Sequence, residues 1–170
     1  MLRKTLIATL CSSVLLGSAV PAMAATPQAF PSEQGTLNLT PVAAGLDHPW
    51  ALAFLPDRQG ILVTERPGNL RLVGADGKLS APLSGVPKVW AKGQGGLLDV
   101  ALSPDFKQDR MVYLSYAEGG GAGGTAGTAV GRGRLSDDLS GLKDFQVIFR
   151  QEPKPVSYTH LRAHETSLHL

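Results

Sequence analysis

A repeated strand–turn–strand pattern is the feature of this sequence that most constrains its fold. Residues 93–116 hold two short apolar runs, 97–102 and 111–116, separated by a Ser-Pro-Asp turn. Apolar runs of this length bounded by Gly, Pro and Asp are typical of β-strands, because most helices are longer. The same pattern occurs earlier, in residues 50–65, so the chain contains two related hairpins.

The two copies align with a constant offset on each side of the turn. The offset is 48 residues before the turn and 50 after it, so the second copy has the longer loop. A repeat of this length made of short strands is typical of β-propeller blades, which have four strands each. Chance similarity is the alternative, because strand–turn–strand units resemble one another. The matching turn residues are Ala53, Pro56 and Asp57 in the first copy and Ala101, Pro104 and Asp105 in the second.

We therefore predict an all-β fold with two four-stranded blades. A glycine-rich segment, residues 118–128, is expected to be a flexible hairpin tip in the second blade. It lacks the Lys-Ser/Thr pair of a P-loop and precedes a strand, which argues against nucleotide binding. A further strand is expected over residues 37–43, where Pro41 would confine it to an edge or a bulge. The predicted strands are 50–55, 61–65, 69–73 and 79–83 in the first blade and 97–102, 111–116, 130–135 and 145–150 in the second.

Residues 1–24 have the pattern of a signal peptide. Arg3 and Lys4 precede an apolar stretch over residues 6–17, and an Ala-Met-Ala sequence that suits signal peptidase ends at Ala24. A retained N-terminal anchor is the alternative, although the apolar stretch is short for a bilayer. We expect cleavage after Ala24 and a periplasmic protein.

Cleavage would remove the only cysteine and the excess of positive charge. Because Cys11 lies in the signal segment, the mature chain could form no disulfide. Residues 25–157 contain 13 Lys and Arg against 13 Asp and Glu. A chain without net charge has no overall attraction to nucleic acid or anionic lipid, so we expect neither partner and no membrane insertion after cleavage. Residues 25–36 are expected to be a leader that need not be ordered.

The last residues, 156–170, differ from the rest of the sequence. They carry His160, His164 and His169, and histidine-rich runs can bind metal ions. We reject a metal site, because SYTHLRAHET resembles the conceptual translation of sequencing-adapter DNA. The tail is interpreted as non-native, so that about 155 residues of this sequence are authentic.

Few residues stand out as catalytic candidates. His48 lies beside Asp47, and an Asp-His pair can be half of a catalytic arrangement. Sequence neighbours rarely face each other in an extended segment, however, and no serine nucleophile motif accompanies this pair. We therefore expect His48 to face solvent or to act as a capping residue.

Other prominent residues have structural interpretations. Asp57 and Asp105 recur at matching positions, so their side chains are expected to accept backbone N–H bonds in the turns. Glu65 and the arginine after it end a predicted strand, where an ion pair or a solvated edge is the usual outcome. Trp50 and Trp90 are expected to pack in the core or between blades.

Gln94 is the most informative polar residue. It lies between Gly93 and the Gly95-Gly96 pair, just before the predicted strand 97–102. Flanking glycines would let the backbone approach a ligand closely, while the amide supplies two donors and an acceptor. A plain turn residue is the interpretation that composition and spacing alone favour.

Several segments together resemble a known family. These are LDHPWALAFLPD, ILVTERPGNLRLV, GQGGLLDVALSPDF, and RGRLSDD with FQVIFRQEPK. They are similar to the N-terminal part of the soluble quinoprotein aldose sugar dehydrogenases, the glucose/sorbosone dehydrogenase family, from about residue 39 to residue 155. The resemblance implies a six-bladed β-propeller that binds pyrroloquinoline quinone (PQQ) and Ca²⁺. It also implies oxidation of the C1 hydroxyl of an aldose to the lactone, with an unidentified electron acceptor. Gln94 matches the family's glutamine at the quinone pocket, which implies a cofactor contact.

The resemblance assigns no catalytic residue to this chain. The family's general-base histidine lies in a His-x-Gly-Gly segment, whereas His160 is followed by Leu161-Arg162-Ala163. Two blades of six would expose apolar faces and unpaired strand edges. We therefore expect the 170-residue chain itself to bind no cofactor and to oxidise no sugar. A propeller that serves as a binding or interaction module, or as a metal-dependent lactonase-like hydrolase, is the alternative, because one fold hosts many functions.

Overall fold

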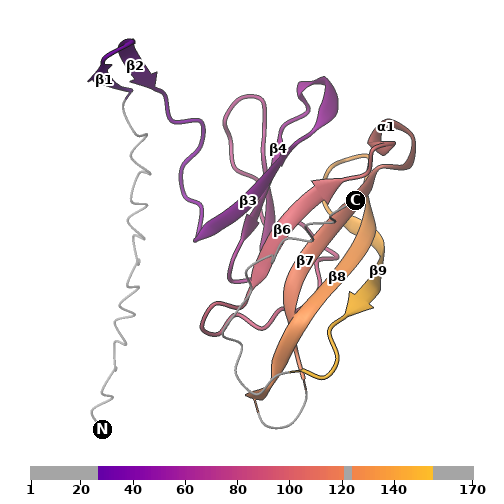
Figure 1. The fold of residues 1–170 in the computed structure, drawn as a ribbon. Coiled ribbons are helices and arrows are strands. Elements are labelled where there is room, and N and C mark those ends of the chain that lie inside the picture. Colours follow the sequence, from indigo (N-terminus) through magenta and orange to yellow (C-terminus); the bar gives the residue numbers. More distant parts are fainter. Residues whose placement is uncertain (1–26, 121–123, 155–170) are drawn as a thin grey trace, which may run out of the picture.

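The structure of this chain is a computed structural model, and it describes residues 27–120 and 124–154 (Figure 1). Three predictions fall outside this part of the chain. They are the signal peptide (residues 1–24), the non-native tail (residues 156–170) and the histidines of that tail, His160, His164 and His169.

Nine strands form three antiparallel sheets within the described residues. β1 and β2 pair as a separate hairpin, β3–β4–β5 form a three-stranded sheet, and β6–β7–β8–β9 form a four-stranded sheet in sequence order. The prediction of an all-β fold is confirmed. No helix in the described part of the chain is long and apolar enough to cross a lipid bilayer. The elements are β1 (Gln28–Ser32), β2 (Gly35–Leu39), β3 (Pro49–Phe54), η1 (Pro56–Arg58), β4 (Ile61–Glu65), β5 (Asn69–Val73), β6 (Leu97–Leu102), α1 (Phe106–Asp109), β7 (Met111–Gly119), β8 (Ala126–Leu135) and β9 (Leu142–Arg150).

The two larger sheets repeat the same local geometry. β3 is followed by η1 and β4, and β6 is followed by α1 and β7. The pairing of β3 with β4 shifts register between Pro49 and Leu52, and the pairing of β6 with β7 shifts register between Leu97 and Val100. These positions are 48 residues apart, because 97 − 49 = 48 and 100 − 52 = 48. Because the register shift lies at the same place in both strand pairs, the sequence repeat is also a structural repeat.

The predicted strand over residues 79–83 is wrong. This segment makes only an isolated bridge to Val73. The N–H groups of Ser80 and Leu83 each donate to a carbonyl of β5 at 2.8 Å. Pro82 lies between these donors and has no N–H, so a continuous ladder cannot form. The first of the larger sheets therefore has three strands where four were predicted.

The N-terminal segment is more regular than predicted. β1 lies within residues 25–36, which were expected to be a leader that need not be ordered, and it pairs with β2. β2 ends before Pro41 instead of running to residue 43. The Ser32 hydroxyl donates to the Gly35 carbonyl at 2.5 Å. Gly35 has a φ of 126°, which glycine adopts readily, and this lets the chain reverse between the two strands.

β7 and β8 are longer than predicted, so the hairpin tip is shorter than residues 118–128. Their pairing continues as far as Gly119 opposite Ala126. Glycine and alanine have low β propensity. Ala117 and Ala126 are nevertheless 0% and 1% exposed, so burial and backbone pairing hold these small residues in the sheet.

The main core lies between the two larger sheets, with β3 and β6 adjacent (Figure 1). The fully buried Thr64 hydroxyl donates to the Leu98 carbonyl at 2.5 Å and connects β4 to β6. Burying a large apolar side chain contributes about 1.5–3 kcal/mol, so this layer supplies most of the stability. The buried cluster consists of Leu55, Leu62, Leu70, Leu83, Leu97, Val100, Phe106, Val112, Leu114, Tyr116, Ala129, Leu135 and Leu142.

Large apolar side chains are exposed on β3 and β9. Trp50, Leu52 and Phe54 are 52%, 55% and 70% exposed, and Ile148 and Phe149 are 51% and 54% exposed. Alternate side chains of a strand point to opposite faces, so one face of β3 has no neighbour among the described residues. The expectation that Trp50 packs in the core is therefore wrong for the described residues. Its packing between blades remains a prediction.

Candidate functional site

Gln94 lies on an exposed turn just before β6. The Gly95 N–H donates to the Lys92 carbonyl at 2.9 Å, which closes a four-residue turn with Gly93 and Gln94 at its centre. Gly93 has a φ of 57°, the positive value that a type II′ turn requires at its first central position. The Gln94 side chain is exposed. The turn position of Gln94 is confirmed, while its contact with a cofactor remains a prediction.

The glycines after Gln94 allow a close approach within the chain itself. Gly95 and Gly96 are both buried. A Cβ atom on Gly96 would collide with the carbonyl oxygen of Arg66, and one on Gly95 with the carbonyl oxygen of Trp90. Gly96 also has a φ of 154°, a value that other residues rarely adopt. Arg66 and Trp90 therefore occupy the space beside Gly95 and Gly96, whereas nothing lies within 4 Å of a Cβ atom placed on Gly93. The close approach of a ligand to the glycines that flank Gln94 remains a prediction.

Arg66 joins three segments at this end of the sheets. Its N–H donates to the His48 carbonyl at 3.0 Å, and its carbonyl accepts from the Leu97 N–H at 3.1 Å. Its guanidinium Nη1 donates to the Gly93 carbonyl at 2.5 Å. Arg66 thus connects the end of β4 with the starts of β3 and β6 and with the Gln94 turn. Sequence reasoning missed these contacts, because Gly93 lies 27 residues away and no local pattern marks the pair.

Glu65, the residue before Arg66, is a carboxylate with 0% of its side chain exposed. Its Oε1 accepts from the Asp47 N–H at 2.8 Å, and its Oε2 accepts from Asn69 Nδ2 at 2.9 Å. Arg71 Nη1 lies 3.5 Å from Oε1 and completes an ion pair. These donors compensate for the water that the charge loses on burial. Of the two outcomes expected at this strand end, the structure has an ion pair and not a solvated edge for Glu65, but the partner is Arg71 and not the adjacent arginine.

His48 faces solvent, as predicted, with 66% of its side chain exposed. Its Nδ1 nevertheless contacts the Asp47 carboxylate, so the expectation that these neighbours face apart is wrong. The reason is the backbone, because His48 has a φ of 48° and the segment is not extended there. In the part of the chain that the structure describes, no hydroxyl side chain bonds to this pair, so it is not arranged as a nucleophilic triad.

Trp90 and Lys92 lie on the segment that leads into the turn. Lys92 Nζ is 4.7 Å from the centre of the Trp90 ring, within the range of a cation–π interaction. The backbone N–H of Trp90 donates to the Ala117 carbonyl at 2.8 Å, and its side chain is partly buried beside Gly119. Trp90 therefore packs against β7, which agrees with its predicted packing role.

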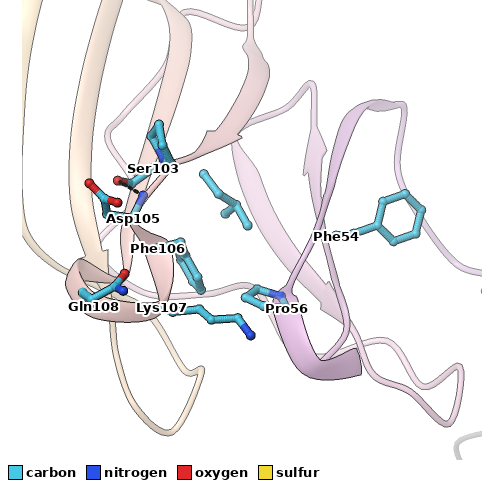
Figure 2. A pocket seen from close by; sticks show the side chains of 9 residues that line it. Phe54, Pro56, Ser103, Asp105, Phe106, Lys107 and Gln108 are labelled. Carbon is cyan, nitrogen blue, oxygen red and sulfur yellow. Dashed lines mark hydrogen bonds between the residues drawn. The ribbon is translucent and has the colours of Figure 1, made fainter.

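A groove of about 390 Å³ lies at the other end of the sheets, between η1 and α1 (Figure 2). Figure 2 shows Phe106 and Lys107 from α1 on one side and Pro56 from η1 on the other, and Phe54 from the end of β3 also lines the groove. Lys107 Nζ donates to Asp57 Oδ1 at 3.0 Å and connects the two turns. The groove is thus separated from the Gln94 turn by the length of β6.

The expectation that Asp57 and Asp105 accept backbone N–H bonds is wrong. Asp57 pairs with Lys107, and Asp105 precedes α1 without a capping bond from its side chain. Asp109 takes the expected role in the second turn, because its Oδ1 accepts from the Met111 N–H at 2.8 Å. A carboxylate four residues further along the loop has the geometry that Asp105 lacks.

The residues around Gln94 suit one edge of an anionic, planar quinone such as PQQ. The Gln94 amide supplies donors and an acceptor, Lys92 supplies positive charge, and Trp90 supplies an aromatic surface. The turn is exposed, so these residues form part of a site and not an enclosed pocket. For Ca²⁺, the described residues contain no group of three or more His, Cys, Asp or Glu side chains that could hold a metal ion. We therefore assign no calcium ligand among them.

The described residues form an all-β protein. Its two larger antiparallel sheets repeat the same strand–turn–strand arrangement, and the polar Gln94 turn lies at one end of them. The family model described as Glucose / Sorbosone dehydrogenase matches residues 46–164, a range that includes β3 to β9 and the Gln94 turn. The chain belongs to the glucose/sorbosone dehydrogenase family.

Comparison with individual proteins agrees with this family. The chain is 61% identical over 125 residues to the aldose sugar dehydrogenase YliI of Escherichia coli (strain K12), a match that covers 74% of this chain and 33% of that protein. The solved structure of the soluble aldose sugar dehydrogenase of Escherichia coli in its apo-form is 67% identical, with a TM-score of 0.62, and covers 64% of this chain and 31% of that chain. The PQQ-bound form of the aldose sugar dehydrogenase from Streptomyces coelicolor is 32% identical, with a TM-score of 0.54. This match covers 70% of this chain and 35% of that chain. The chain thus spans about a third of the length of these relatives.

Proposed function

We propose that this chain is part of a PQQ-dependent aldose sugar dehydrogenase that oxidises the C1 hydroxyl of aldoses to the lactone. The observation that carries this proposal is the 61% identity to an Escherichia coli aldose sugar dehydrogenase, within a family match over residues 46–164. The PQQ-bound Streptomyces coelicolor relative supports the choice of cofactor. Because the match covers 33% of the Escherichia coli protein, we assign the activity to a longer protein, a six-bladed propeller with about two blades in this chain.

In this proposal the described residues contribute to cofactor binding. PQQ, when bound, supplies the oxidising chemistry by taking a hydride from the sugar carbon. Gln94 would hydrogen-bond to it from the exposed turn, and Lys92 would attract its carboxylates. We assign none of the described residues as the general base. Calcium is proposed from the family resemblance alone.

The test is an assay of the complete protein. The gene is resequenced through codon 155 and onward, and the full-length product is loaded with PQQ and Ca²⁺. We expect aldose-dependent reduction of an artificial dye that requires PQQ, with the lactone as the product by NMR. Lactone hydrolysis without dye reduction would favour a hydrolase instead, and sugar binding without turnover would favour a binding module.

The contribution of Gln94 is tested separately. Replacement Gln94→Ala is expected to weaken PQQ binding about tenfold, which corresponds to about 1.4 kcal/mol, because one hydrogen bond is lost. Gln108→Ala is the matched control, since Gln108 is also exposed but lies beside the groove at the other end of the sheets. Equal PQQ affinity for the two variants would contradict a contact between Gln94 and the cofactor.

We also propose that the protein is exported to the periplasm and cleaved after Ala24. The basic, apolar and Ala-Met-Ala segments within residues 1–24 support this. Mass spectrometry of the protein from the periplasmic fraction is expected to find Ala25 at the N-terminus. An intact N-terminus in the membrane fraction would point to a retained anchor.

A further inference from the structure

We propose that Arg66 is the positioning residue for Gln94, and that its guanidinium holds the Gly93–Gln94 peptide in the orientation that presents Gln94 to the quinone. The inference rests on the proposed function, because it assumes that Gln94 contacts PQQ. It concerns a residue that makes no contact with the cofactor itself and acts through the turn.

The central peptide of the Gln94 turn has two possible orientations. Type I′ and type II′ turns differ by a flip of the peptide between the two central residues, and type I′ requires a positive φ at both. In the structure Gly93 has a φ of 57°, whereas Gln94 is not among the residues with positive φ. The turn therefore has the type II′ arrangement. A flip of the Gly93–Gln94 peptide would force a positive φ on Gln94 and change the direction of its side chain.

The Arg66 guanidinium binds the group that such a flip would move. Its Nη1 donates to the Gly93 carbonyl, the carbonyl of the central peptide, at 2.5 Å. A hydrogen bond from a charged donor is about twice as strong as one between neutral groups. A flip would turn this carbonyl away and break the bond, so Arg66 favours one of the two orientations.

Arg66 can act as an anchor because its own backbone is held. The backbone N–H of Arg66 donates to the His48 carbonyl, and its backbone carbonyl accepts from the Leu97 N–H. Its side-chain stem passes beside Gly96, where a Cβ atom would come within 2.6 Å of Arg66 Cγ. The glycine at position 96 thus leaves the room that Arg66 needs to reach Gly93.

The Gln94 side chain is exposed, like the turn that carries it. No hydrogen bond between its amide and another described residue is present, and the nearby Lys92 ammonium lies over the Trp90 ring. The direction of the Gln94 amide therefore depends on the turn backbone, and the turn backbone depends on Arg66.

The first experiment uses the full-length protein without cofactor. Replacement Arg66→Met keeps most of the stem and removes the guanidinium. Arg58→Met is the matched control, because Arg58 is exposed on η1 and makes no side-chain hydrogen bond or ion pair among the described residues. We expect amide hydrogen exchange at Gly95, whose N–H closes the turn, to become at least about tenfold faster in Arg66→Met and to stay unchanged in Arg58→Met.

The second experiment measures PQQ affinity by titration of the same apo-proteins. Arg66→Met is expected to raise the Kd for PQQ about tenfold, the same change as Gln94→Ala. The double variant is expected to raise Kd no further than either single variant, because Arg66 acts through Gln94. Arg66→Lys keeps the positive charge and a single donor nitrogen but lacks the planar guanidinium, so it is expected to give an intermediate Kd. It replaces Arg66→Met in the test if that variant does not fold.

The outcomes separate the inference from the proposed function. A wild-type protein that binds no PQQ would overturn both. If the wild type binds PQQ and Gln94→Ala weakens binding, the proposed function stands. Unchanged exchange at Gly95 in the Arg66 variant, unchanged PQQ affinity, or losses that add in the double variant would then overturn the inference about Arg66 alone.

Discussion

Adjacent residues at the end of β4 have very different environments. Glu65 is fully buried and bonded to Asp47, Asn69 and Arg71, whereas Arg66 is partly exposed and reaches across to the Gln94 turn. Removing one partner of a buried charge network costs several kcal/mol, because the remaining groups stay buried without water. The carboxylate of Glu65 therefore holds the strand end from which Arg66 extends.

Replacement Glu65→Gln is expected to destabilise the full-length protein by about 3 kcal/mol, because the amide nitrogen of glutamine must face one of the donors. Denaturant unfolding measures this change. The control Asp76→Asn removes an exposed carboxylate that lies 3.0 Å from Lys78, and no measurable change is expected there. A loss for Glu65→Gln no larger than for the control would show that the buried network is not needed.

Among the elements, β7 and β9 are joined at their ends by a charged cluster. Glu118 on β7 accepts from Arg150 at 2.9 Å and from Lys154 at 2.6 Å. Burial of Glu118 acts to raise its pKa, but the hydrogen bonds from Lys154 and Arg150, with their positive charge, outweigh burial and hold the pKa below its usual 4.5. The carboxylate therefore stabilises the folded sheet in its ionised form.

The sign of this effect predicts a pH dependence. Because the folded pKa of Glu118 lies below 4.5, its stabilisation is fully present above that pH and is lost as the pH falls through the folded pKa. Thermal unfolding of the full-length wild type and of Glu118→Gln, followed from neutral pH to about pH 3, measures it. The difference in Tm is expected to be largest at neutral pH and to close in acid. A difference that does not change with pH would contradict the assignment.

In the molecule as a whole, the described part leaves apolar surface uncovered on both sides. Trp50, Leu52 and Phe54 are exposed on β3, and Ile148 and Phe149 on β9. Exposed apolar patches next to unpaired strand edges favour association. In the proposed six-bladed propeller, neighbouring blades would cover these surfaces.

The 170-residue chain produced alone is therefore expected to associate and to show no activity. Size-exclusion chromatography with light scattering is expected to find species larger than a monomer. Dye reduction with aldose, PQQ and Ca²⁺ is expected to stay at the level of the buffer control. A soluble monomer with sugar-dependent dye reduction would contradict the view that the activity needs the longer protein.

Much of the fold could be predicted from local sequence. The strands over residues 61–65, 69–73 and 97–102 were predicted with the bounds that the structure has. Short apolar runs and turn residues determine such strands within a few positions. The prediction of a strand over residues 79–83 was wrong because Pro82 interrupts the pairing. The sequence did not predict β1, because residues 25–36 lack an apolar run.

The sequence by itself determined most of the strands, the repeat and the turn at Gln94, since these depend on residues close together along the chain. Only the tertiary structure decided that Glu65 is buried, that Arg66 binds the Gly93 carbonyl, and that Gly96 faces Arg66. The physical reason is separation along the chain: the bond from Asp47 to Glu65 spans 18 residues and the bond from Arg66 to Gly93 spans 27. Contacts of this kind exist only once the sheets have packed together, and no local pattern of residue types specifies them.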